Sequence, residues 1–155
     1  MAEIKTTGSL TELLQKAKPS DISSFLEENA ESLLQGEKPF AAYMRERFHE
    51  KKLRRQDVFL QADIPEGYGY KLISEEKHTV QRDVILRICL AGQFSLRETQ
   101  TALRLYGMAP LYAKIPRDAV LIVAINQHTY EMEAIDAMLQ EQGMKPLYCC
   151  KGTEE

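Results

Sequence analysis

The C-terminal half of the chain contains the segment RDVILRICLAGQFSLRETQTALRLYGMAPLY (residues 82–112) and, after a short spacer, the segment RDAVLIVAINQHTYEMEAIDAMLQEQGMKPLY (residues 117–148). Both begin with Arg-Asp and an apolar run, and both close on Gly-Met-x-Pro-Leu-Tyr. They match along their length if the second carries one extra residue in its middle, which indicates a tandem duplication. Repeats of about this period are typical of stacked helical units that cover one another's apolar faces. The pattern predicts two equivalent helical hairpins, with Leu103 and Leu139 in matching buried positions.

The rest of the chain also has helical periodicity, and strand patterns are nearly absent. Pro39 is well placed to begin a helix, and Gly107 and Gly143 are well placed to end the two hairpins. We therefore predict an all-α protein. Its parts are an acidic helical N-terminal arm (1–38), a core domain (39–91), a helical extension (92–148, with repeat units 82–112 and 117–148) and a flexible tail (149–155).

The N-terminal arm is predicted to hold two helices. Ser9-Leu10-Thr11-Glu12 matches a capping box, so the first helix is expected to start there and to end before Pro19. Ser20-Asp21 is expected to cap a second helix that continues to Gly36. The apolar side chains of these helices are too many to leave in water, so we expect them to cover the core or a dimer partner. They are Leu13, Leu14, Phe25, Leu26, Leu33 and Leu34.

Composition and motifs favour a cytoplasmic protein without a catalytic or metal site. The longest apolar run, residues 119–125, is too short to span a bilayer, and the N-terminus has no signal-peptide pattern. The three cysteines give neither a disulfide framework nor metal-ligand spacing, and His49, His78 and His128 lie in separate segments without ligand partners. No nucleophile has a base in a recognisable motif, so we expect neither an enzyme nor a bound cofactor.

Basic charge is concentrated in the middle of a chain whose formal net charge is -3. Residues 40–90 hold ten Lys/Arg against eight Asp/Glu, whereas residues 1–39 hold four against seven and residues 91–155 six against eight. Such a local patch is compatible with contacts to phosphate. Its members are Arg45, Arg47, Lys51, Lys52, Arg54 and Arg55.

The spacing of short apolar segments between Phe40 and Ala91 resembles that of phage-repressor-type (Cro/cI, or Xre) helix-turn-helix proteins. More narrowly, the run YGYKLIS (residues 68–74), the following Arg-Asp and the Gly-Met-Ala-Pro-Leu-Tyr ending look like a group of small bacterial Xre-like proteins with an appended helical region. The resemblance covers about residues 40–148 and implies a five-helix repressor-like core, which the N-terminal arm and the duplicated hairpin extend. The matching apolar positions are Leu53, Val58, Ala62, Ile64, Leu72, Val84, Ile85 and Ile88.

In proteins of this type the second short helix lies in the major groove of duplex DNA, and the first contacts the backbone. The resemblance implies that Lys71 donates to guanine or phosphate, that Tyr70 and Ser74 bond a base or touch a thymine methyl, and that Arg55 pairs with a phosphate. Residue by residue, the implied groove-facing set is Pro65, Glu66, Gly67, Tyr70, Lys71 and Ser74, and the implied backbone set is Arg54, Arg55 and Gln56.

Three features favour a version of this fold that does not bind DNA. Glu66 places a carboxylate on the groove-facing helix, Gly67 and Gly69 each cost that helix about 1 kcal/mol relative to alanine, and Glu75-Glu76 adds negative charge just after it. Two functions therefore stay open. One is a sequence-specific transcriptional regulator that binds duplex DNA, and the other is an adaptor that binds another protein, such as a signalling enzyme, through the hairpins or the arm. The outer face of the last repeat is also free to dock a second copy, because many repressor-type proteins bind two half-sites as dimers.

Overall fold

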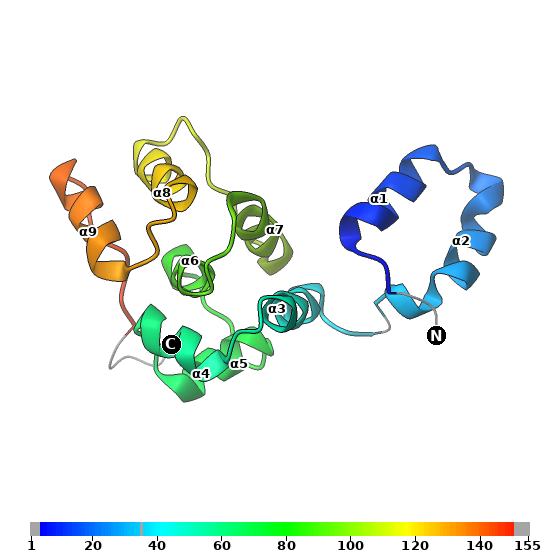
Figure 1. Cartoon of the computed structure of the whole chain (residues 1–155), viewed down its shortest axis with the longest axis horizontal. Helices are drawn as coiled ribbons and strands as arrows, with labels where there is room; N and C mark the ends of the chain where they lie inside the picture. The colour runs from blue at the N-terminus through cyan, green and yellow to red at the C-terminus, as the bar shows by residue number, and fades with distance from the viewer. Residues whose placement is uncertain (1–3, 35, 151–155) are drawn as a thin grey trace. The chain divides into compact units, whose positions relative to one another are not determined.

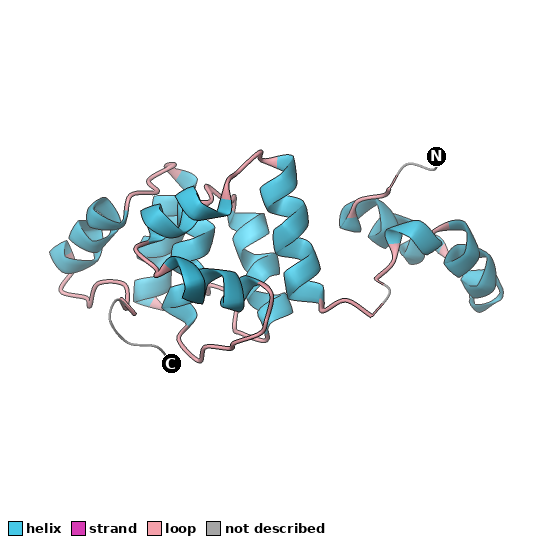
Figure 2. Cartoon of the chain, turned by 90° about the horizontal axis from the view of Figure 1, so that it is seen from below, coloured by secondary structure: helices cyan, strands magenta, loops and turns pink. Residues whose placement is uncertain are grey.

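The structure, a computed structural model, describes residues 4–34 and 36–150, and every regular element in them is helical (Figure 2). The all-α prediction is confirmed. The chain separates into two compact units, Met1–Glu37 and Lys38–Glu155. The α-helices are α1 (Thr7–Lys16), α2 (Ile22–Glu28), α3 (Pro39–Glu50), α4 (Arg55–Ala62), α5 (Glu66–Ile73), α6 (Arg82–Ala91), α7 (Leu96–Tyr106), α8 (Pro116–Asn126) and α9 (Met132–Glu141), and the 3-10 helices are η1 (Pro19–Asp21) and η2 (Ala30–Ser32).

The first unit differs from the prediction at the start of its first helix. α1 begins at Thr7, and Thr6 is its N-cap, because the Thr6 hydroxyl accepts from the Ser9 N–H at 3.2 Å. The predicted capping box at Ser9 is therefore wrong, since the backbone N–H of that residue already lies inside the first turn. The predicted end before Pro19 is confirmed, because α1 stops at Lys16.

The second helix of this unit is shorter than predicted. α2 ends at Glu28, where the Phe25 carbonyl accepts from both the backbone N–H and the side-chain amide of Asn29, at 3.0 and 2.8 Å. Asn29 is buried, and its amide oxygen accepts from the Lys5 ammonium at 2.6 Å. Neither α1 nor α2 contains a buried residue. Leu13, Leu14, Leu26 and Leu34 are each about half exposed, so their coverage by the core or by a partner stays a prediction.

The second unit is built around α6, which lies in the middle of this unit in Figure 1. Residues 84–91 of α6 are all buried, and α4 and α7 pack directly against this helix. α3 begins at Pro39, as predicted, and buries Phe40, Met44 and Phe48 against the same core. α3 also packs against α5 and α7, so α3 to α7 share one apolar core.

The tandem repeat is visible as two matching helix pairs, α6 with α7 and α8 with α9. Leu103 and Leu139 are both fully buried, as the alignment of the repeats predicts. Gly107 and Gly143 follow α7 and α9 with φ of 88° and 71°, a left-handed conformation that glycine adopts without strain.

The two units of the repeat close in the same way. The Gln100 side chain on α7 bonds both the N–H and the carbonyl of Leu111, at 2.7 and 2.8 Å. Asp136 occupies the equivalent place on α9 and accepts from the Leu147 N–H at 2.9 Å. Each Pro-Leu-Tyr ending is therefore held back against its own second helix.

The endings are also bonded across the repeat. The Tyr148 N–H donates to Asp83 at 2.9 Å, and the Tyr112 N–H donates to Asp118 at 2.9 Å. Each aspartate at the start of one unit thus receives the end of the other. Beyond Tyr148, Cys149 is exposed and Cys150 is buried, and the remaining residues of the predicted flexible tail, 151–155, lie outside the described residues.

Candidate nucleic-acid interface

α4, a tight turn and α5 are the segments to which the resemblance assigns DNA contact. α4 ends at Ala62, and its C-cap Asp63 has a φ of 58° and so turns the chain through the left-handed region. Ile64 is buried beneath the turn, and α5 begins at Glu66, directly after Pro65. The turn is short because a single left-handed residue and one proline redirect the chain between two packed helices.

The faces of α5 divide between the core and solvent. Tyr68, Gly69, Leu72 and Ile73 are buried. The remaining positions follow the helical spacing of one outward face: Glu66, Gly67, Tyr70 and Ser74 are exposed, and Lys71 is half-exposed. These five residues are the α5 residues that the resemblance places toward DNA.

The two glycines of α5 have different roles. A Cβ built on Gly69 would lie 2.5 Å from the Phe59 ring, so the absence of a side chain lets α5 pack directly on α4. A Cβ built on Gly67 would meet nothing within 4 Å, because this residue faces open space. The helix-propensity cost of Gly69 therefore has a packing reason, whereas Gly67 keeps the outward face of α5 flat.

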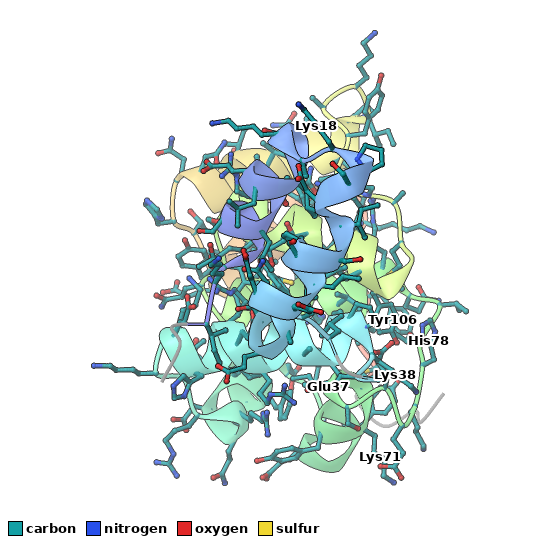
Figure 3. All side chains as sticks on the ribbon, turned by 90° about the vertical axis from the view of Figure 1, so that its right-hand side faces the viewer. Lys18, Glu37, Lys38, Lys71, His78 and Tyr106 are labelled. Atoms are coloured by element: carbon teal, nitrogen blue, oxygen red, sulfur yellow. The ribbon has the colours of Figure 1, made fainter. Side chains whose placement is uncertain are left out.

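A groove of about 440 Å³ runs between α3, α4 and α5. Its cationic lining comes from three helices: Arg45 of α3, Arg55 at the start of α4 and Lys71 of α5. Tyr70 also lines the groove, and its ring packs edge-on against Phe59 at 5.2 Å between ring centroids. A second hollow of about 380 Å³ shares Arg45, Arg55 and Tyr70 with this groove and is also lined by His49. Lys71 is at the lower edge of the view in Figure 3.

The groove is lined by some of the residues that the resemblance assigns to DNA contact and by others that it does not. Arg55, Tyr70, Lys71 and Ser74 line it. Pro65, Arg54, Gln56, Glu66 and Gly67 are exposed outside the lining, and Arg54 has Asp57 as an ion-pair partner at 4.0 Å. Arg45 and His49 were not among the predicted site residues. Their spacing of four on α3, offset from the buried Met44 and Phe48, is the signal that places them on one outward face.

The basic patch of the sequence does not act as one surface. Arg47 and Lys51 point to the other side of α3, where both bond Glu98 of α7, at 3.0 and 2.9 Å. Burial raises the pKa of Glu98, but bonds from Lys51, the Ser95 N–H and Arg47 outweigh it and lower this pKa to about 2. These two cations therefore join α3 to α7 and leave the groove to Arg45 and Arg55.

The acidic pair after α5 is also divided between two roles. Glu75 is half-buried, and its carboxylate accepts from the Ala41 N–H at 3.4 Å in the first turn of α3, while its carbonyl accepts from Lys38 at 3.1 Å. A carboxylate at a helix N-terminus is favourable because of the helix dipole. Glu76 is exposed and lines the groove. Only one of the two carboxylates thus opposes an anionic ligand there.

The geometry suits an extended anion more than a reactive centre. Three cationic side chains from separate helices and the Tyr70 hydroxyl can donate to phosphate oxygens, whereas the Ser74 hydroxyl already donates to the Lys71 carbonyl at 3.2 Å. Within residues 4–34 and 36–150, no three His, Cys, Asp or Glu side chains come together as metal ligands. In the same part of the chain, no helix has the length and apolar character needed to cross a membrane. The chain matches no protein-family model, no curated protein and no solved structure.

Proposed function

We propose that the chain is a sequence-specific DNA-binding protein that regulates transcription in the bacterial cytoplasm, with α4 and α5 as a repressor-type helix-turn-helix. The observation that carries this proposal is the groove in which Arg45, Arg55 and Lys71 meet beside the outward face of α5. Arg55 and Lys71 have no ion pair with any described residue, so both are available to phosphate or base edges. No cofactor takes part in this proposal.

Each part of the proposed interface has a separate task. Arg55, at the first turn of α4, bonds a phosphate and fixes the register of the protein on the duplex. Lys71 donates to guanine O6 or N7, and Tyr70 and Ser74 contact bases or the sugar-phosphate backbone. Gly67 adds no side chain, which allows a base edge to approach α5 closely. Glu66, in the first turn of α5, accepts from the exocyclic amine of cytosine.

The adaptor is the second candidate function, and the arm favours it. Leu13, Leu14, Leu26 and Leu34 remain about half exposed, and a partner protein that covered them would gain the free energy of burying their apolar area. In this alternative, Glu66 and Glu76 keep the groove from binding DNA, and the helix-turn-helix serves only as a scaffold.

Selection from a random duplex library distinguishes the two functions. The full chain is incubated with the library at about 0.15 M ionic strength, and the bound duplexes are sequenced over several rounds. The proposal predicts enrichment of one motif that the protein binds at least about 1,000-fold more tightly than random duplex. If no motif is enriched and all duplexes bind equally weakly, the regulator is excluded and the adaptor is favoured.

A further inference from the structure

Arg87 is a charged residue in the middle of the most buried helix of the fold. Only 3% of this side chain is exposed. Its guanidinium donates to three backbone carbonyls: Nε to Tyr148 at 2.6 Å, Nη1 to Ala62 at 3.1 Å and Nη2 to Leu147 at 3.0 Å. No carboxylate is paired with it among the described residues. A buried cation held only by carbonyls is stable only while those carbonyls stay in place.

Comparison of the two repeat units shows why Arg87 occurs only in the first repeat unit, residues 82–112. In the alignment of the two units, the position of Arg87 is occupied by Ile122 in the second. Gln100 of the first unit bonds both backbone groups of Leu111, whereas Asp136 has no donor for the carbonyl of Leu147. Arg87 supplies that missing donor. The ending of the second repeat unit is therefore held by the Arg87 side chain, which comes from the first repeat unit.

The third bond of Arg87 reaches the helix-turn-helix. Ala62 is the last residue of α4, and the next residue, Asp63, makes the left-handed turn toward α5. The same chain ending touches this turn again, because the Cys149 thiol lies 3.7 Å from the Asp63 carboxylate. Within the turn, the Asp63 N–H donates to the Leu60 carbonyl at 3.2 Å and the Ile64 N–H donates to the Phe59 carbonyl at 3.0 Å.

We propose that Arg87 is a positioning residue that couples the docked ending of the second repeat unit, residues 147–149, to the α4–α5 turn and thereby sets the affinity of α5 for DNA. The inference rests on the proposed function for its effect on DNA, but the coupling itself does not. A partner that binds the second repeat unit and displaces this ending leaves two of the three donors of Arg87 without acceptors, because the carbonyls of Leu147 and Tyr148 move away and only that of Ala62 remains. The guanidinium then shifts to find new acceptors, which loosens the end of α4 and the turn. The appended repeat is then the regulatory part of the molecule.

Hydrogen exchange on the full chain tests the coupling without DNA. In Arg87→Met, the amides of Asp63 and Ile64 and those in α5 should lose at least about tenfold in protection, because a lost buried bond of this kind opens the turn. Amides of α8 should change much less. An equal loss of protection throughout the second repeat unit, or no loss of protection at the turn, would contradict the proposal.

A matched pair of variants guards against a general loss of stability. Asp136→Ala removes the acceptor of the Leu147 N–H and should also lower protection at Asp63 and Ile64. Gln100→Ala, the same change in the first unit, releases Leu111 and should leave the turn protected. If both variants affect the turn equally, the effect is not specific to the ending of the second unit and the proposal fails.

DNA binding gives the second readout. With a duplex selected by the wild-type chain, Arg87→Met should lower affinity by about tenfold or more at a temperature at which the variant stays folded. If the wild-type chain selects no duplex, the proposed function fails while the exchange result still decides the coupling. If the duplex binds the wild type and Arg87→Met equally well, the coupling to DNA is wrong and the proposed function stands.

Discussion

The guanidinium of Arg117 on α8 donates to both carboxylate oxygens of Asp83 on α6, at 2.9 and 2.8 Å. The repeat-equivalent residues, Arg82 and Asp118, make the same bidentate pair in the opposite direction. The contact is therefore reciprocal, as in a two-fold symmetric dimer, whereas stacked repeats make head-to-tail contacts. The duplication forms an internal pair of units that closes on itself.

The two ion pairs should differ in their contribution to stability. The Asp118 side chain, the partner of Arg82, is fully buried, whereas the Asp83 side chain, the partner of Arg117, is 14% exposed. Removing Arg82 therefore leaves a more deeply buried carboxylate without its ion-pair partner than removing Arg117 does. We expect Arg82→Ala to lower the free energy of unfolding by about 3 to 5 kcal/mol and Arg117→Ala by about 1 to 3 kcal/mol. Urea unfolding measures both changes in the free energy of unfolding, provided that the variants and the wild type have equal m-values. The reverse order would contradict the role given to the burial of Asp118.

The glycines of α5 provide a matched pair of substitutions. Gly69→Ala should lower the free energy of unfolding by about 1 to 3 kcal/mol, because the new methyl group would overlap the Phe59 ring. Gly67→Ala should raise it by up to about 1 kcal/mol, since the added Cβ faces open space within a helix. Thermal unfolding of the two variants tests the close packing of α4 and α5. Equal effects of the two changes would show that the helices are not in direct contact there.

Glu98 should make stability depend on pH in the acid range. The pKa of this carboxyl is lowered from 4.5 to about 2 in the folded protein, so its stabilisation is fully present above pH 4.5 and is lost as the pH falls toward 2. Glu98→Gln should remove this part of the pH dependence. Glu50 is a suitable control, because its side chain is 54% exposed and also pairs with Arg47. A Glu50→Gln variant with the same loss of pH dependence would contradict the assignment to Glu98.

The two glutamates after α5 should affect DNA binding unequally. Glu76→Gln should raise the affinity for duplex about fivefold at low salt, since a unit charge a few Å from a phosphate contributes about 1 kcal/mol in water. Glu75→Gln should have little direct effect on affinity and should instead destabilise the start of α3, where its carboxylate is bound. Titrations of a duplex with each variant at two salt concentrations check this prediction. The gain in affinity from Glu76→Gln should be smaller at the higher salt concentration, because salt screens the repulsion between Glu76 and the phosphates.

The repeat and the helices were predictable because local patterns encode them. Both units keep Arg-Asp at the start and Gly-Met-x-Pro-Leu-Tyr at the end, and Pro39 marks the start of α3 as expected. The early end of α2 was not predictable from local patterns. At that point the Asn29 side chain is buried and bonds the Phe25 carbonyl and Lys5, which lies 24 residues away in the sequence.

The candidate site was predictable only in part. The outward face of α5 follows from helical spacing, and Glu66, Gly67, Tyr70 and Ser74 on it are exposed. The role of these residues at DNA stays a prediction. Arg45 was recognised as part of the basic patch but was left out of the DNA-facing residues, because α3 lies outside the two-helix motif. Arg87 was missed because it interrupts an apolar helix, and its carbonyl partners come from residues 62, 147 and 148, which only the tertiary fold brings together.

Binding of a selected duplex to the wild type, Lys71→Glu and Arg55→Ala across a range of salt concentrations tests the central claim most directly. We predict that Lys71→Glu costs about 1 to 3 kcal/mol and relaxes specificity at one position, while Arg55→Ala weakens all sequences similarly and lowers the salt slope by about one. If both variants bind every duplex as the wild type does, with the same salt slope, the groove beside α5 does not bind DNA and the account is contradicted.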